Sequence, residues 1–152
     1  MSIKNFFVVY SPKRMWWKIW LGLACFPMLP QHRAKLLKMG GVNVLGRALI
    51  YGGVGIDTVA PHKIFLGNNV AITAGTRILT HYLDPSRSGR MFRIGEVHIE
   101  DDVFIGVNVV ICNSVTIGKG AIVGAGSIVT KDISPYQVWA GNPARYIKAR
   151  EH

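Results

Sequence analysis

The chain has 152 residues, of which 49% are hydrophobic, 17% are charged and 17 are glycine. This length suits one domain with a buried core, and the composition excludes a disordered chain or a coiled coil. The formal net charge is +10, and none of the eight acidic residues precedes Asp57. The basic residues before Asp57 are Lys4, Lys13, Arg14, Lys18, Arg33, Lys35, Lys38 and Arg47. This basic end predicts an anionic partner, such as a membrane surface or a nucleic acid.

The first predicted element is a helical segment within residues 1–40. Its apolar run, Met15 to Leu29, is interrupted by Lys18 and closed by Pro27 and Pro30. A membrane-spanning helix needs about 20 apolar residues, so we do not expect one here. The internal lysine and the tryptophans also argue against a signal peptide.

Two interpretations of this segment stay open, and they are compatible. In the first, the helix folds back and caps the rest of the protein. In the second, Trp16, Trp17 and Trp20 lie at the headgroup depth of a membrane, with the lysines on anionic lipid.

A six-residue repeat dominates the rest of the chain. From Val97 the sequence divides into VHIEDD, VFIGVN, VVICNS, VTIGKG, AIVGAG and SIVTKD, and upstream the same frame gives IFLGNN, VAITAG and TRILTH. Six residues of α-helix turn a side chain by about 600°, whereas six is a multiple of the strand period of two. Short strands with inward aliphatic residues therefore predict a β-solenoid. The third positions are Val44, Ile50, Ile56, Leu66, Ile72, Ile78, Ile99, Ile105, Ile111, Ile117, Val123 and Val129.

The repeat frame breaks twice, between Ile56 and Leu66 and between Ile78 and Ile99. The second break contains HYLDPSRSGRMFRIGE, whose polar residues cannot face the inside of a solenoid. We therefore expect a protruding loop at about 82–95. Loops on a rigid scaffold commonly carry function, and His81 lies at the root of this one.

The repeats, together with GAGSIVTKDISPYQVWAGNPARYIK (Gly124 to Lys148), resemble the hexapeptide-repeat acyltransferases over residues 41 to 148. The resemblance is to the sugar O-acetyltransferase branch, which includes maltose and galactoside acetyltransferases. It implies an all-β, left-handed parallel β-helix with three repeats per coil, hence about four coils. The expected organisation is a helical segment at 1–40, the β-helix at 41–134 and a C-terminal extension at 135–152. The resemblance also implies a homotrimer with active sites between subunits.

Acetyl transfer from a thioester to a hydroxyl needs a base, and histidine titrates near neutral pH. By the resemblance, His81 takes the place of the family's catalytic histidine and acts by direct transfer. Asp57 and Asp84 are candidates to orient its ring. Asp57 is preferred because its GID context resembles an aspartate of serine acetyltransferases, although a turn-capping role fits equally. Asp84 and Tyr82 are also expected to bind substrate.

The donor implied by the resemblance is acetyl-CoA, and the matching positions are Ala125, Thr130, Lys131, Arg145 and Lys148. The cations among them suit the phosphates of CoA. Val107 departs from the family because it replaces a serine that contacts CoA.

The predicted function is therefore transfer of an acetyl group to a sugar hydroxyl, in surface polysaccharide biosynthesis or on its lipid-linked precursor. Alternatives are another acceptor (a streptogramin-type antibiotic, serine or a sugar amine) or a non-enzymatic scaffold. The carbonic-anhydrase branch of the fold needs three zinc-binding histidines, and the spacing of His81 and His98 does not supply them, so no metal is expected. Cys25 and Cys112 form no metal-ligand motif and favour a reducing, cytoplasmic location, at the inner face of the membrane if residues 1–40 bind it. No nucleic-acid motif accompanies the charge.

Overall fold

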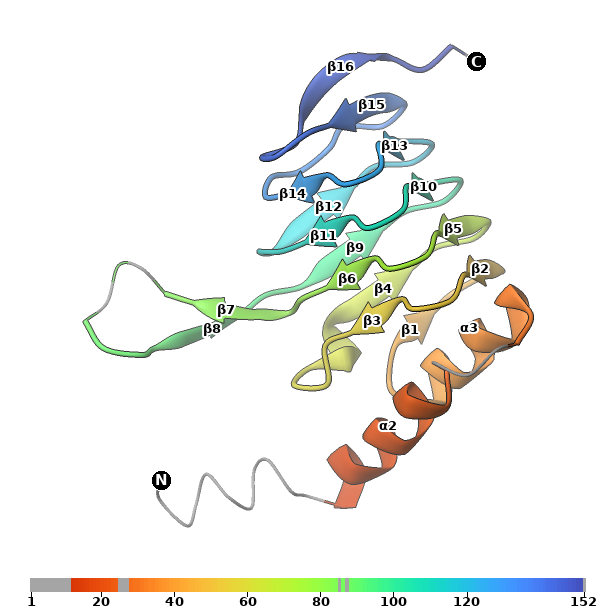
Figure 1. The fold of residues 1–152 in the computed structure, drawn as a ribbon, viewed down its shortest axis with the longest axis vertical. Helices are drawn as coiled ribbons and strands as arrows, with labels where there is room; N and C mark the ends of the chain where they lie inside the picture. Colours follow the sequence, from red (N-terminus) through yellow and green to blue (C-terminus); the bar gives the residue numbers. More distant parts are fainter. Residues whose placement is uncertain (1–11, 25–27, 85, 87, 152) are drawn as a thin grey trace.

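The computed structural model describes residues 12–24, 28–84, 86 and 88–151. The chain enters through two helices, α2 (Pro12–Leu23) and α3 (Pro30–Met39). It then winds through short strands that stack as successive coils (Figure 1). The predicted all-β solenoid behind a helical segment is therefore confirmed.

The strands form three parallel sheets, named here sheets A, B and C. Each coil contributes one strand to each sheet in that order, and the chain passes through the cycle four times, as the resemblance implied. Sheet A contains β1 (Asn43–Val44), β4 (Ile64–Leu66), β9 (Val97–Ile99) and β12 (Val115–Ile117). Sheet B contains β2 (Ala48–Ile50), β5 (Val70–Ile72), β10 (Phe104–Ile105) and β13 (Ile122–Val123). Sheet C contains β3 (Gly55–Ile56), β6 (Arg77–Ile78), β11 (Val110–Ile111) and β14 (Ile128–Val129).

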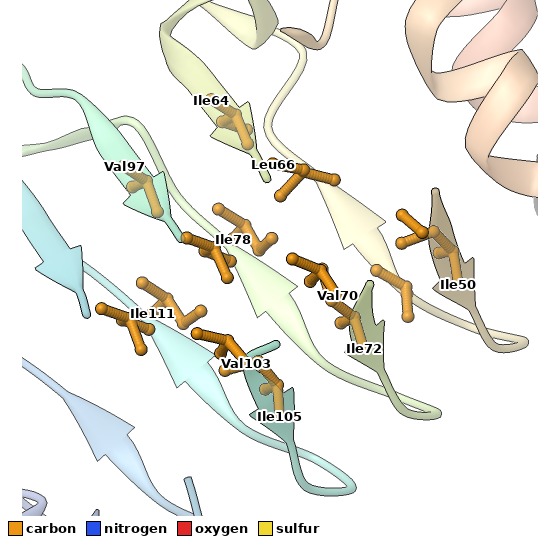
Figure 2. Packing of buried hydrophobic residues seen from close by; sticks show 14 of the residues in the cluster. Ile50, Ile64, Leu66, Val70, Ile72, Ile78, Val97, Val103, Ile105 and Ile111 are labelled. Atoms are coloured by element: carbon orange, nitrogen blue, oxygen red, sulfur yellow. The ribbon is translucent and has the colours of Figure 1, made fainter. Parts of the chain in front are cut away.

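The register explains why a six-residue repeat forms this core. Strands pair so that each third-position residue lies beside another one, as Ile72 does with Ile105 and Ile78 with Ile111. These side chains are fully buried and stack in columns inside the coils (Figure 2). Burial of each such side chain contributes about 1.5–3 kcal/mol. The column weakens at its start, where Ile56 is only partly buried.

Small residues after the strands allow the coils to lie close together. A Cβ on Gly106 would come within 2.6 Å of the main-chain nitrogen of Ala125 in the next coil. Asn69 and Asn108 adopt φ of 56° at the corners, a conformation that asparagine tolerates better than most residues. The fourth and later positions of the repeat therefore form the turns.

The two helices cover the first coil. Leu21 of α2 packs beneath Gly40, and the ring of Trp17 lies against Gly41. Arg33 of α3 is buried and donates hydrogen bonds from Nε to the carbonyl of Ala24 (3.0 Å) and from Nη1 to that of Ile50 (3.3 Å). The cap interpretation is thus confirmed for the described residues, while Cys25 and Pro27 lie outside them. Within those residues, neither helix has the length and apolar character needed to cross a bilayer.

Both breaks in the repeat leave the solenoid at the same edge. The first contains the 3-10 turn η1 (Pro61–Lys63). The second is an antiparallel hairpin of β7 (His81–Leu83) and β8 (Phe92–Ile94), which projects sideways from the coils (Figure 1). At the other end of the chain, β15 (Gln137–Ala140) continues sheet B and pairs with the antiparallel β16 (Arg145–Ala149).

Candidate active site

The candidate site lies on the edge where the chain leaves sheet C and enters sheet A, called here the C–A edge. Asp57 follows β3 in the first coil, and Thr80 and His81 follow β6 in the second. Since β3 and β6 are neighbours with Ile56 opposite Ile78, the residues that follow the two strands meet. The fold therefore brings together two predicted site residues that are separated by 24 positions.

His81 and Asp57 are joined directly. The ring nitrogen Nδ1 of His81 lies 2.5 Å from Oδ2 of Asp57. The same oxygen accepts hydrogen bonds from the main-chain N–H of Thr80 (2.8 Å) and of His81 (3.0 Å). The other oxygen, Oδ1, accepts the N–H of Val59 (2.9 Å). Asp57 thus fills both of its predicted alternatives, because it caps a turn and also holds the histidine.

This environment favours the ionised form of Asp57. Burial of the carboxyl raises its pKa, but the hydrogen bonds from Val59, His81 and Thr80 lower it by more, so that the pKa lies below its usual value. The side chain of Asp57 is 2% exposed, whereas that of His81 is 37% exposed. A buried carboxylate therefore supports an imidazole that solvent can reach.

The arrangement also sets which ring nitrogen of His81 is able to accept a proton. A carboxylate at Nδ1 favours the tautomer with its proton on Nδ1, which leaves Nε2 free to accept a proton. The ring of Phe92 from the opposite strand lies 5.9 Å from the imidazole. The N–H of Gly95 donates to the carbonyl of Thr80 (2.8 Å), which closes the base of the hairpin next to the histidine. The site can thus provide a positioned general base.

Asp84 does not orient His81, which corrects one of the two candidates. Its Oδ1 accepts hydrogen bonds from Nη2 of Arg93 (2.5 Å) and from Oγ (2.6 Å) and N–H (3.0 Å) of Ser86. Arg93 and Ser86 hold the pKa of this carboxyl well below its usual range. Asp84 follows β7 and Arg93 lies on β8, so their ion pair joins the two arms of the hairpin and holds the carboxylate there. Tyr82 faces Arg93 in the same register, on the side of the strand opposite to His81.

The predicted CoA residues fall into two groups. Thr130 and Lys131 follow β14 on the C–A edge, two coils beyond His81, and strands in neighbouring coils are about 4.8 Å apart. The side chain of Lys131 is exposed. Ala125 lies at the turn between sheets B and C, while Arg145 and Lys148 lie on β16 at the end of sheet B. The structure therefore aligns one cation with the histidine and places the other two on a neighbouring face.

Thr80 is a site residue that sequence reasoning missed. Its hydroxyl donates to Oδ2 of Asp57 (2.7 Å), and the residue is fully buried. The only sequence signal was its place directly before His81, which gives no indication that a residue 23 positions earlier lies beside it.

Cys112 lies on the same edge in the third coil, and burial raises the pKa of its thiol, which disfavours a nucleophilic thiolate. In the part of the chain that the structure describes, no three His, Cys, Asp or Glu side chains gather as metal ligands.

The fold and the site define a parallel β-solenoid that carries a histidine–carboxylate pair on one edge. Residues 96–131 match the model of the hexapeptide repeat of succinyl-transferase. The curated protein YvoF of Bacillus subtilis (strain 168), which is named as an acetyltransferase, is 43% identical over 96 residues, covering 62% of this chain and 53% of its own. The chain thus spans about half the length of that curated relative.

Solved structures extend the likeness to almost the whole fold. A maltose O-acetyltransferase from Clostridium difficile 630 has a TM-score of 0.72 at 27% identity, covering 92% of this chain and 87% of its own. A galactoside acetyltransferase in complex with coenzyme A has a TM-score of 0.67 at 26% identity, covering 91% and 81%. The predicted resemblance is confirmed: residues 96–131 carry the hexapeptide repeat, and the chain has the fold of the hexapeptide-repeat acetyltransferases.

Proposed function

We propose that this protein is an acetyl-CoA-dependent O-acetyltransferase in which His81 is the general base. The observation that carries the proposal is the contact between Nδ1 of His81 and the buried carboxylate of Asp57. That contact fixes the ring through Nδ1 and leaves Nε2 as the proton acceptor of a side chain that is 37% exposed. The named activities of the similar proteins, and the coenzyme A bound to one of them, support the choice of reaction and donor.

The chemical step is a direct transfer. Nε2 of His81 takes the proton of the acceptor hydroxyl as the hydroxyl oxygen attacks the carbonyl carbon of the thioester. The C–S bond then breaks, and the thiolate of CoA leaves with the proton returned by His81. Asp57 stays ionised throughout and stabilises the imidazolium that forms in between.

The donor would lie along the C–A edge. Thr130 and Lys131 are about 10 Å from the level of His81, since two coils separate them. A pantetheine arm is long enough to join a thioester at His81 to phosphates near Lys131. Arg145 and Lys148 would then meet CoA only if it bends around the turn that contains Ala125.

The hairpin beside His81 supports assembly into a homotrimer of left-handed β-helices with the site between subunits. Leu83, Phe92 and Ile94 are all more than half exposed and share with His81 one side of the hairpin. Apolar side chains in such a row usually lie against another surface. A neighbouring subunit over this side would cover the histidine and exclude water from the thioester.

The proposed acceptor is a sugar hydroxyl, in a surface polysaccharide or its lipid-linked precursor, with the reaction on the cytoplasmic side. This acceptor class follows the maltose and galactoside enzymes among the similar structures. The same base would also serve a sugar amine, a streptogramin-type antibiotic or serine.

The experiment that tests the proposal is calorimetric titration of acetyl-CoA into the purified protein, with free CoA for comparison. Saturable binding at one site per chain is expected. A free-thiol assay with sugar acceptors, and with the corresponding amino sugars, then measures turnover. Absence of binding at millimolar acetyl-CoA would contradict the proposal and favour a scaffold that has lost the activity.

A further inference from the structure

The outer face of α2 exposes a row of large apolar side chains. Met15, Trp16 and Ile19 are each more than half exposed, and Leu23 is 39% exposed. Met15, Ile19 and Leu23 are spaced four residues apart, and Trp16 adjoins them, so all four lie on one side of the helix. We call these four residues the outer face of α2.

The opposite side of α2 is fixed to the protein. Leu21 is buried against Gly40, and Trp17 packs on Gly41. The ring of Trp20 meets that of Trp16 edge-on, with centroids 5.4 Å apart, which holds Trp16 in place. The helix is thus docked firmly through one side, and its outer face points away from the coils.

The charge around this face has one sign. No acidic residue occurs before Asp57, and the exposed cations of the described cap and first coil are Lys13, Lys18, Lys35, Lys38 and Arg47. Arg33, which the sequence grouped with them, is buried in the cap and does not contribute to this surface. The carboxylates lie elsewhere: Asp57 is in the site, Asp84 is in the hairpin, and Glu151 follows β16 at the far end of the chain. The others, Glu96, Glu100, Asp101, Asp102 and Asp132, lie on or beside sheet A. The apolar row is thus surrounded by positive charges only. Such a surface complements one that is both apolar and anionic.

We propose that the outer face of α2 binds an anionic lipid bilayer. The helix would lie in the plane of the interface, with Met15, Trp16, Ile19 and Leu23 at the boundary between headgroups and acyl chains. The surrounding lysines would lie against lipid phosphates. A basic helix docked by one side and apolar on the other has the features of an interfacial helix, and it is too short to span.

This contact would place the catalytic edge near the membrane. His81 belongs to the second coil, directly beyond the coil that the helices cover. The diameter of one helix, about 10 Å, and two coil spacings of about 4.8 Å put His81 within about 20 Å of the membrane surface. The inference goes beyond the proposed function and does not depend on it, since lipid binding is measured without donor or acceptor.

The test is co-sedimentation of the full chain with vesicles of equal parts phosphatidylcholine and phosphatidylglycerol, compared with phosphatidylcholine alone. The variant is Ile19→Ser, and the matched control is Ile147→Ser on β16 at the far end of the solenoid. The two isoleucines are 54% and 58% exposed, so neither substitution should disturb folding. A second variant, Lys35→Glu with Lys38→Glu, removes charge from the cap.

We expect binding to the anionic vesicles, a loss of about tenfold in the partition coefficient for Ile19→Ser, and none for Ile147→Ser. The lysine variant and added salt should also weaken binding. Equal binding to both vesicle types, or no binding to either, would overturn the proposal. So would a change of oligomeric state in Ile19→Ser by analytical ultracentrifugation, because a second copy would then occupy the face.

Discussion

The two halves of the C–A edge differ although they share one main-chain ladder. In the third and fourth coils the edge is three residues long, Cys112–Ser114 and Thr130–Asp132. In the first and second coils it is lengthened by the turn that contains η1 and by the hairpin β7–β8. The strands that precede all four turns pair in the same register.

This comparison shows how the fold separates stability from chemistry. The core column through Ile78 and Ile111 continues past both kinds of edge without a break. What changes is the chain just after the strand, where Asp57 in one coil and His81 in the next face each other. A rigid ladder can therefore accept insertions that carry a site, because the inserted residues do not enter the core.

The largest expected effect is a loss of turnover, and it tests the part of the C–A edge in the first and second coils. His81→Ala should lower turnover about 10²–10⁴-fold, because no other group would take the acceptor proton. Affinity for acetyl-CoA and thermal stability should stay close to those of the wild type. The matched control is His98→Ala, since the His98 side chain is 42% exposed and also contacts a carboxylate, that of Glu96. Equal losses in the two variants would assign the effect to something other than a base at His81.

Ile78→Ala and Ile111→Ala compare the stability of the core column at two places. Ile78 lies in the coil from which the hairpin leaves, and Ile111 lies in the next coil. Each removes a fully buried side chain and should lower the free energy of unfolding by about 2–5 kcal/mol, as measured by denaturant titration. If the hairpin does not affect packing in the core, the two variants should lose the same free energy of unfolding. A much smaller loss for Ile78→Ala would mean that the hairpin loosens the column at its base.

Asp57→Asn tests the carboxylate beneath the histidine. Turnover should fall about 10²-fold, because an amide has only one acceptor oxygen. In either orientation its NH₂ group faces N–H donors, those of Thr80 and His81 on one side or that of Val59 on the other. The loss of charge should also destabilise the fold by about 1–3 kcal/mol at neutral pH. Since the pKa of Asp57 is lowered on folding, its stabilisation is present above pH 4 and is lost as the pH falls through the folded value. Thermal melts of both proteins from pH 7 to pH 3 should therefore converge; a constant gap would show that the charge is not involved.

The smallest expected effect is a loss of acetyl-CoA affinity, and it concerns the part of the C–A edge in the third and fourth coils. Lys131→Ala should weaken acetyl-CoA binding about tenfold, because a charge-assisted contact to a phosphate is lost. Lys119→Ala, which removes another exposed cation on the turn between sheets A and B, is the control and should leave affinity unchanged. Calorimetry at low salt measures both. An unchanged affinity for Lys131→Ala would move the donor site to the face with Arg145 and Lys148.

The sequence by itself determined the solenoid and the position of the protruding loop, and the resemblance to the hexapeptide-repeat family added the coil count. A six-residue period that matches the strand period of two leaves one choice of inward face, and the polar run after His81 has to leave the coils. His81 was singled out because it stands where the period fails and because the family resemblance puts the catalytic histidine at the matching place. These features are local, so they are visible along the chain.

Only the tertiary structure decided which residues meet. Asp57 and Asp84 were both candidates beside His81, and the nearer one in sequence, Asp84, is paired with Arg93 instead. Arg33 counted as a surface cation, yet it is buried between α2 and the first coil. The place of Thr80 directly before His81 gave no sign of its contact with Asp57. The contact of Asp57 with Thr80 and His81 depends on how one coil stacks on the next. The pairing of Asp84 with Arg93 depends on the register of the hairpin, and the burial of Arg33 depends on how the helices dock on the first coil. Each is decided by packing between segments that are separated along the chain, so none is visible in the residues of one segment alone.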